Sequence, residues 1–335
     1  MFVFALLVLS NVVFPASPAV LVTQPVPSDT VVITEWEVPW ERSRPRDPIV
    51  DGDGNVWFVG QRGNYIAMLD PGSGEFTRYE IPEGALPHNI IVGPDGYLWY
   101  AGNGDSHIGR LDPKSSQIVR YDMPDPAARD PHTLQFAPDG SLWFTVQSGN
   151  MVGHMNPVAG RIEFVKVPIE QSRPYGIVVD ESSRPWIVLF GTNHIATVDP
   201  KWMDLKLYPL PWEDARPRRL QLTPDGMIWY VDYARGTLGR LDPNSGDVSE
   251  WQTPGGSGSR PYAMAIDDQG RLWFVETGSD PNQFVGYDPT SGEFFSITAI
   301  PSGAGSVRHM VFDAPTRTVW FGTDANTIGR AVIPG

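Results

Sequence analysis

The sequence predicts a seven-bladed β-propeller, an all-β fold built from four-stranded antiparallel sheets set around one central channel. The first observation is a tryptophan that recurs near the end of a short apolar run, at Trp57, Trp99, Trp143, Trp186, Trp229, Trp273 and Trp320. The successive gaps of 42, 44, 43, 43, 44 and 47 residues match the length of one propeller blade. The second is the high content of turn formers, 34 Gly and 33 Pro. The third is that no stretch has sustained helical periodicity.

The strands of one unit follow from its turn signals, and the third unit, residues 130–168, serves as the example. Its expected strands are Thr133–Ala137, Ser141–Val146, Met151–Met155 and Arg161–Val167. Residues 138–140, Pro-Asp-Gly, form a tight turn between the first two strands, and residues 156–160 form the turn before the fourth. Pro presets φ in such turns and Gly supplies positive φ, so we expect plain turns here rather than calcium sites. The tryptophans are expected in the blade core.

The two ends of the repeat array predict how the ring closes. The last unit stops after Thr327–Ile333 and lacks a fourth strand. Residues 33–39 match the fourth-strand pattern of residues 118–124 position by position. We therefore expect the first strand to complete the seventh blade, which removes an exposed sheet edge. Residues 31–335 then form a single propeller domain, which we expect to act as a monomer.

The amino-terminal residues predict export. Residues 1–19 combine an apolar run with small residues suited to cleavage, which indicates a signal segment too short for a stable membrane span. Residues 20–30 then form a linker. The basic start of a normal signal is missing, since no Lys or Arg precedes Arg42. A misassigned start codon or a weak anchor would account for this. We expect a periplasmic or secreted protein.

Composition excludes several classes of function. The chain has no Cys, which excludes disulfides, thiolate catalysis and Cys-ligated zinc. Its formal net charge of −14 argues against nucleic-acid and anionic-membrane binding. There is no Gly-x-Ser-x-Gly elbow, so we do not expect a covalent acyl-enzyme.

A ring of polar residues is expected at the channel mouth. A Pro lies twelve residues before six of the seven tryptophans, and Arg308 takes its place in the seventh unit. The residue after it begins the innermost strand. These ring residues are Arg46, His88, His132, Tyr175, Arg218, Tyr262 and His309. A narrow channel would be filled by small or apolar residues at lower desolvation cost, so this ring indicates function. The alternative is a polar funnel satisfied by water and nearby carboxylates.

Hairpin symmetry and the surrounding charges predict the neighbours of this ring. Tyr262 is expected beside Glu276, and Arg218 is expected to pair with Asp232. Further arginines crowd the same rim, namely Arg44, Arg173, Arg216, Arg219, Arg260 and Arg308. Guanidinium groups suit carboxylate and phosphate, so the rim predicts an anionic or carbonyl-rich small-molecule or peptide-like ligand. Pairing of these arginines with Asp47, Asp130 and Asp232 is the structural alternative.

The repeated unit Pro-x-x-Ile…Pro-Asp-Gly-x-Leu-Trp-Phe…Ile-Gly-Arg-Leu-Asp-Pro…Tyr-x-x-Pro resembles the streptogramin B (virginiamycin B) lyase family over residues 31–335. The resemblance implies a seven-bladed propeller that opens the ester-closed ring of a cyclic depsipeptide by elimination, assisted by Mg²⁺. It also implies a catalytic pattern of a His after the blade Pro, Glu-Pro-His in the next blade, and a Glu three residues after that blade's Trp.

This chain departs from that pattern. In direct register the pattern falls on Arg218, Arg260-Pro261-Tyr262 and Glu276, of which only Glu276 matches. Moved round the ring to blades 2 and 3, it finds His88 and Asp130-Pro131-His132, while Val146 replaces the final Glu. The resemblance therefore predicts the fold better than the substrate, and we expect weak or no streptogramin activity.

Two functions remain open at this stage. The first is a carbon–oxygen lyase in which His132 or His88 is the general base, with His309 and Glu276 as further candidate catalytic groups. Mg²⁺ held by Asp130 or Glu276 would be a Lewis acid on the carbonyl. Substrate would be held by Arg46, Tyr175, Arg218, Arg260, Tyr262 and Arg308. Hydrolysis by the same residues is a variant. The second is a non-catalytic exported propeller that binds an anionic small molecule, peptide or glycan.

Overall fold

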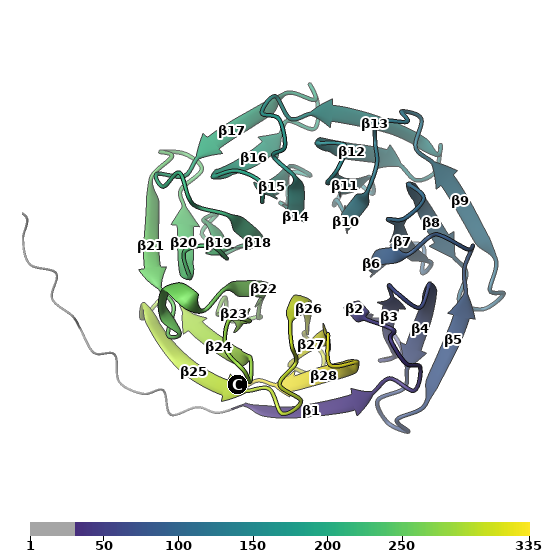
Figure 1. Cartoon of the computed structure of the whole chain (residues 1–335). Helices are drawn as coiled ribbons and strands as arrows, with labels where there is room; N and C mark the ends of the chain where they lie inside the picture. The colour runs from purple at the N-terminus through teal and green to yellow at the C-terminus, as the bar shows by residue number, and fades with distance from the viewer. Residues whose placement is uncertain (1–30) are drawn as a thin grey trace, which may run out of the picture.

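The structure is a computed structural model that describes residues 31–335. Within them, 28 strands form seven four-stranded antiparallel sheets arranged as a ring around a central channel, as predicted (Figure 1). The predicted signal segment 1–19 and linker 20–30 lie outside the described residues. One short 3-10 helix, η1 (Gly256–Gly258), interrupts the strands, and none of residues 31–335 form a helix long and apolar enough to cross a membrane.

Each blade runs outward from an inner strand at the channel. Blade 1 consists of β2 (Pro45–Val50), β3 (Val56–Gly60), β4 (Tyr65–Leu69) and β5 (Phe76–Glu80). Blade 2 consists of β6 (Pro87–Val92), β7 (Leu98–Gly102), β8 (His107–Leu111) and β9 (Ile118–Asp122). Blade 3 consists of β10 (Pro131–Phe136), β11 (Leu142–Val146), β12 (Met151–Asn156) and β13 (Arg161–Lys166). Blade 4 consists of β14 (Pro174–Val179), β15 (Pro185–Leu189), β16 (His194–Val198) and β17 (Leu205–Pro209). Blade 5 consists of β18 (Pro217–Leu222), β19 (Ile228–Asp232), β20 (Thr237–Leu241) and β21 (Val248–Gln252). Blade 6 consists of β22 (Pro261–Ile266), β23 (Leu272–Glu276), β24 (Gln283–Asp288) and β25 (Glu293–Ala299).

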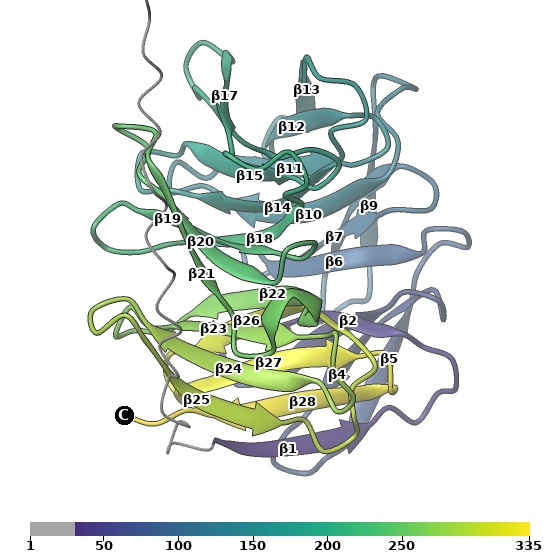
Figure 2. The same cartoon turned by 60° about the vertical axis from the view of Figure 1, so that its left-hand side comes forward.

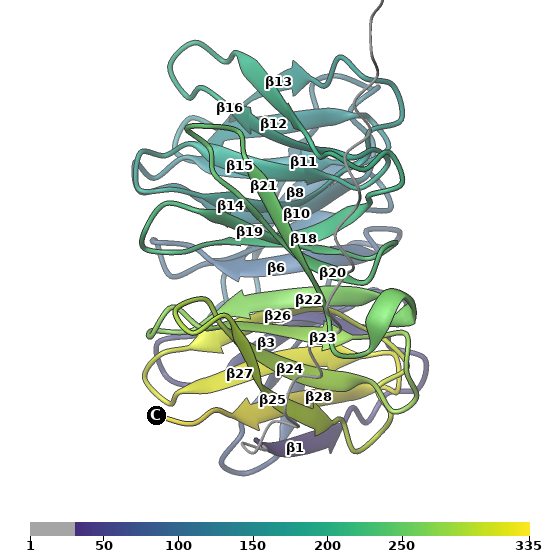
Figure 3. The same cartoon turned by 90° about the vertical axis from the view of Figure 1, so that its left-hand side faces the viewer.

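The seventh blade closes the ring with strands from both ends of the described chain. It has the order β1 (Val32–Glu37), β28 (Thr327–Val332), β27 (Thr318–Thr323) and β26 (Val307–Asp313). Strand β1 pairs antiparallel with β28 along its whole length, and the two lie side by side in Figures 1 and 3. The side chain of Glu35 fixes this pairing, because its carboxylate accepts hydrogen bonds from Ser302 and from Thr327 Oγ1. The predicted closure is confirmed.

The repeated tryptophans pack between neighbouring blades, as predicted for core residues. Seen from the side, the blades are stacked as twisted sheets whose faces contact one another (Figure 2). Trp99, Trp143 and Trp273 are among the largest fully buried side chains. A buried indole N–H needs an acceptor. In three blades it finds the Asp that opens the first hairpin turn, through the pairs Trp57–Asp51 at 2.7 Å, Trp186–Asp180 at 3.1 Å and Trp273–Asp267 at 3.0 Å. The same Asp thus contributes both to the hairpin turn and to the packing of the core.

Candidate functional site

A cavity of about 350 Å³ lies at the end of the channel where the inner strands begin, and we call it the mouth cavity. It is lined by Arg44, Arg46, Gln61, His88, Asn103, Asp130, His132, Gln147, Tyr175, Phe190, Arg218, Tyr262 and Arg308. Six of the seven predicted ring residues therefore line it. They converge because each is the second residue of the innermost strand of its blade.

The seventh ring position was predicted wrongly. In blade 3, Phe136 pairs with Leu142 across the first hairpin, and five residues lie between them. In blade 7 the equivalent pair is Phe312 and Val319, with six residues between them. The additional residue shifts the inner strand by one position. As a result Arg308 lines the mouth cavity, and His309 faces the channel on its other side.

Two neutral histidines are in contact at the mouth, with their ring planes tilted by 37°. The ring centroids of His88 and His132 are 3.5 Å apart, and the His132 ring lies 4.0 Å from that of Tyr175. Burial lowers the pKa of both imidazoles well below the usual value, and the positive charges of Arg46 and Arg219 lower it further. Both histidines are therefore uncharged at neutral pH and weak as proton acceptors. The other partner of the His132 ring is Thr133, whose Oγ1 lies 2.9 Å from Nδ1.

A pair of tyrosines faces these histidines. The hydroxyls of Tyr175 and Tyr262 are hydrogen-bonded, although the residues come from blades 4 and 6. Burial alone raises the pKa of Tyr175, but Arg46, Arg219, Arg218 and the hydrogen bond from Tyr262 outweigh it, so the pKa of Tyr175 is lowered. Burial and the neighbouring Tyr175 raise the pKa of Tyr262. The lowered pKa of Tyr175 and the raised pKa of Tyr262 favour Tyr262 as the donor in this hydrogen bond.

Arginine side chains make the mouth cavity cationic. Arg218 lies over the rings of Phe190, at 3.6 Å from the centroid, and Tyr262, at 4.6 Å. Arg46 donates from Nη1 to Gln61 at 2.9 Å. Among the described residues, Nε and Nη2 of Arg46 and Nε of Arg218 are buried and have no hydrogen-bond partner. Buried donors without acceptors are costly. These atoms indicate a site shaped for a ligand rich in acceptors.

The two alternative metal ligands belong to different blades. Asp130 lines the mouth cavity, where its carboxylate accepts from Asn103 and from Ser148 Oγ at 2.7 Å, and burial raises its pKa. Glu276 lies opposite Pro261 in the strand register and accepts from the backbone N–H of Gly255 at 2.8 Å, away from the mouth. No group of three or more His, Asp or Glu side chains within residues 31–335 is arranged to hold a metal. Since Mg²⁺ is commonly held by one or two carboxylates with water, the expectation that Asp130 or Glu276 holds it stays a prediction.

Three further expectations about contacts are corrected. Glu276 is not the strand neighbour of Tyr262, because the register pairs it with Pro261 and a bulge follows. Arg218 does not pair with Asp232, whose carboxylate instead accepts from backbone N–H groups of the adjacent loop. Arg260 is exposed outside the mouth cavity, with its guanidinium 6.0 Å from the ring centroid of Tyr233.

A second set of mouth residues, from blades 1 to 4, was not predicted. These are Gln61, Asn103, Gln147 and Phe190. Each lies four residues after the tryptophan of its blade, at the point where the second strand ends. The inner strand begins at the same end of the blade, because the two strands are antiparallel. The repeat period that located the first ring would have located this set too.

The family model for the virginiamycin B lyase family matches residues 32–331. The chain belongs to this family. Virginiamycin B lyase from Staphylococcus aureus is similar in structure, with a TM-score of 0.82 and 24% sequence identity over 91% of this chain and 100% of that one. A streptogramin B lyase structure has a TM-score of 0.81 and 26% identity, over 90% of this chain and 97% of that one.

A third similar structure is a catalytically inactive histidine-to-alanine variant of the S. aureus virginiamycin B lyase with quinupristin. It has a TM-score of 0.81 and 24% identity, over 91% of this chain and 100% of that one. No curated protein matches the chain significantly. These structures confirm the predicted seven-bladed family fold, while the residues at the mouth differ from the family pattern.

Proposed function

We propose that this protein is a carbon–oxygen lyase that acts on an anionic substrate at the mouth cavity. The observation that carries the proposal is the set of buried, unpartnered guanidinium N–H groups of Arg46 and Arg218 around a cavity of about 350 Å³. A carboxylate bound there would satisfy these donors and neutralise their charge. Family membership supports elimination as the type of reaction.

Tyr175 is the group best placed to remove a proton from such a substrate. Its lowered pKa makes the phenolate accessible nearer to neutral pH, and Tyr262 stabilises that phenolate as a hydrogen-bond donor. His132 and His88 were expected to be the base, but their strongly lowered pKa leaves little driving force for proton transfer. In this proposal the two histidines are neutral and position the substrate carbonyl.

The proposed reaction is an elimination. The oxygen of Tyr175 takes the proton from the carbon next to the substrate carbonyl or carboxylate, and the electron pair of that C–H bond forms the new C=C bond. The C–O bond at the neighbouring carbon breaks, and its oxygen leaves as a carboxylate when the substrate is an ester. Arg46 and Arg218 stabilise the enolate-like charge that develops. The carboxylate leaving group needs no proton at neutral pH.

A second candidate function is binding without chemistry. The observation that favours it is the replacement of the family's catalytic pattern, since Arg218, Arg260 and Tyr262 stand at three of its four positions. Such a propeller would hold an anionic small molecule, peptide or glycan through the same arginines. It needs no acid–base pair.

The deciding experiment uses a panel of β-acyloxy carboxylic acids, followed by the absorbance of the unsaturated acid product and by calorimetry. The lyase proposal expects turnover that Tyr175→Phe abolishes and that the remote Tyr121→Phe leaves unchanged. Saturable binding without product, weakened by Arg218→Gln and retained by Tyr175→Phe, would instead support the binding propeller. Neither binding nor turnover for any anionic member would contradict both.

We also propose that the chain is exported by residues 1–19. The support is the apolar, small-residue composition of that segment. Fractionation of cells that express the full chain tests this, with a variant that lacks residues 1–19 as the control. Equal amounts of both proteins in the cytoplasm would contradict export.

A further inference from the structure

The opposite end of the channel holds a second and larger cavity, of about 550 Å³, which we call the lower cavity. Its outer wall is apolar, because an apolar residue near the end of the inner strand lines it in blades 2 to 7. These residues are Val92, Phe136, Val179, Leu222, Ile266 and Phe312. All six are only partly buried. The lower cavity therefore contrasts with the mouth, where the same strands begin with charged and polar groups.

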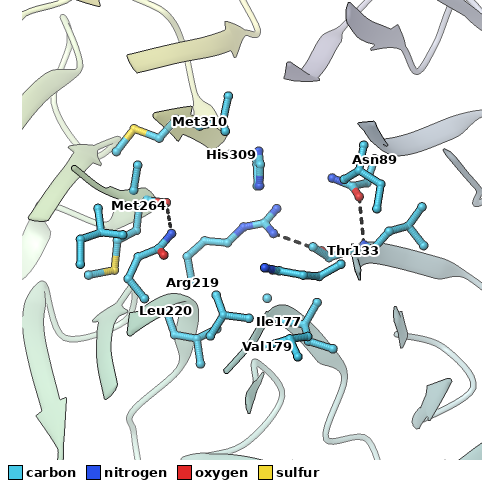
Figure 4. A pocket seen from close by; sticks show the side chains of 18 of the residues that line it. Asn89, Thr133, Ile177, Val179, Arg219, Leu220, Met264, His309 and Met310 are labelled. Carbon is cyan, nitrogen blue, oxygen red and sulfur yellow. Dashed lines mark hydrogen bonds between the residues drawn. The ribbon is translucent and has the colours of Figure 1, made fainter. Parts of the chain in front are cut away.

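Arg219 and His309 lie toward the centre of the lower cavity, as Figure 4 shows, and the polar side chains of Asn89, Thr133, Gln135 and Gln221 also line it. Arg219 is 4% exposed, donates from Nε to the carbonyl of Arg308 at 3.0 Å and from Nη1 to Thr133 Oγ1 at 3.1 Å. Its Nη2 has no hydrogen-bond partner among residues 31–335, and neither has Nδ1 of His309. Burial lowers the pKa of His309 to about 4, so its ring is neutral at pH 7.

Arg219 has one carboxylate partner, Asp47, which it shares with Arg46. The carboxylate of Asp47 lies 3.9 Å from Nη2, beyond hydrogen-bonding distance, and already accepts from Asn89 at 2.9 Å. Arg46 also faces Asp47, with 3.8 Å between Nε and Oδ1. Two guanidinium groups thus share one carboxylate, and Asp47 is not among the residues that line the lower cavity.

The lower cavity is separate from the mouth cavity. The two have no lining residue in common, and the layer that contains Arg219 lies between them. A ligand in the lower cavity would therefore contact none of the groups to which the proposed lyase reaction is assigned.

We propose that the lower cavity binds an apolar carboxylic acid, with the carboxylate on Arg219 Nη2 and the His309 ring and the hydrocarbon chain along the apolar wall. A wholly polar ligand would leave that wall facing water, and a wholly apolar ligand would leave the buried Nη2 unpaired. The three residue-to-residue steps from Arg219 to Leu222 span about 10 Å of strand, which suits a chain the length of octanoate. The volume is within the range of small-molecule sites.

The test is calorimetric titration of the full chain with a series of saturated fatty acids. We expect saturable binding of octanoate that is about fourfold tighter than heptanoate, the gain for one buried methylene. Octanol should bind at least tenfold more weakly, since it lacks the charge that Arg219 recognises. An affinity that does not change with chain length, equal binding of octanol, or no binding of any member would overturn the proposal.

A matched pair of variants tests the location. Gln135 is partly buried and lines the lower cavity, so Gln135→Trp should fill it and abolish octanoate binding. Gln135→Leu keeps the volume and should bind octanoate as tightly as the unmodified chain or more tightly. Asn103→Ala, in the mouth cavity, should leave octanoate binding unchanged. Unaltered binding by a folded Gln135→Trp variant, checked by its melting temperature, would reject this site even if the lyase proposal holds.

Discussion

The hydroxyls of Tyr175 and Tyr262 are hydrogen-bonded to each other, and Arg218, from the blade between theirs, lies over the Tyr262 ring. The two phenols have opposite pKa shifts, lowered for Tyr175 and raised for Tyr262. Groups with diverging pKa values at one site can divide the work of proton acceptor and proton donor. The relationship depends on the ring closure, since the two residues are 87 positions apart in the chain.

The first prediction concerns the pH dependence of turnover. Activity should rise with pH through the pKa of Tyr175, because the phenolate is the base. Tyr262→Phe removes the hydrogen bond that stabilises the phenolate, so the pKa of Tyr175 rises and the ascending limb moves to higher pH. A pH–rate profile and a spectrophotometric titration of tyrosinate measure this. Tyr233→Phe, near the Arg218 guanidinium but outside the mouth cavity, is the control. If the ascending limb of the pH–rate profile lies at the same pH in Tyr262→Phe and in the unmodified chain, Tyr175 is not the base.

Much of this architecture could be predicted from the sequence because propeller blades repeat a local pattern. The tryptophan spacing located the start of the inner strand in six of the seven blades, and the match between residues 33–39 and 118–124 located the closure. The error at His309 arose because spacing counted back from Trp320 ignores one additional hairpin residue in blade 7. A single residue moves a side chain from one level of the channel to the next.

The contacts at the site were less predictable, since they depend on side-chain partners that a repeat does not specify. Symmetry about the turn placed Glu276 near Tyr262, but its carboxylate is held by the backbone of Gly255 in the preceding loop. The carboxylate of Asp232 likewise accepts hydrogen bonds from backbone N–H groups rather than from Arg218. Backbone donors near a loop compete well for a carboxylate, and no residue-type pattern marks them.

The second prediction concerns ring closure. Glu35→Ala removes the acceptor for Ser302 and Thr327, so we expect a loss of about 1–3 kcal/mol in the free energy of unfolding. Glu37→Ala is the matched control, because Glu37 is in the same strand, is exposed and should change stability by less than about 0.5 kcal/mol. Urea denaturation of both variants measures the difference. Deletion of residues 31–39 should cost several kcal/mol. Equal stabilities for Glu35→Ala and Glu37→Ala would remove this carboxylate from the closure.

The third prediction concerns the family substrate. We expect little or no inactivation of quinupristin by this protein, because Arg218, Arg260 and Tyr262 replace the His, Glu and His that the resemblance implies. An antibiotic inactivation assay with the S. aureus enzyme as positive control measures it. The variant Arg218→His, Arg260→Glu, Tyr262→His restores those residue types and should gain activity over the unmodified chain. Inactivation by the unmodified chain at the rate of the positive control would contradict the assignment of a different substrate.

The fourth prediction concerns Glu276 and distinguishes a buried structural carboxylate from a metal ligand. Burial raises the pKa of Glu276, so the folded state holds the proton more tightly than the unfolded state. Stability from this group is therefore present below the unfolded pKa, about 4.3, and is lost as pH rises through the raised folded pKa. Gln cannot ionise and can still accept from Gly255. Glu276→Gln should then match the unmodified chain in stability near pH 4 and exceed it at pH 8.

Urea denaturation at the two pH values, with and without Mg²⁺, measures this difference. The exposed Glu181→Gln serves as the control, and we expect it to change stability equally at both pH values. Glu276→Gln should not change any stabilisation by Mg²⁺, because the Glu276 carboxylate already accepts from the backbone N–H of Gly255. If Mg²⁺ stabilises the unmodified chain and Glu276→Gln abolishes that stabilisation, the Glu276 carboxylate must leave Gly255 to bind the ion. The position of Glu276 described above would then not be its position in the working site.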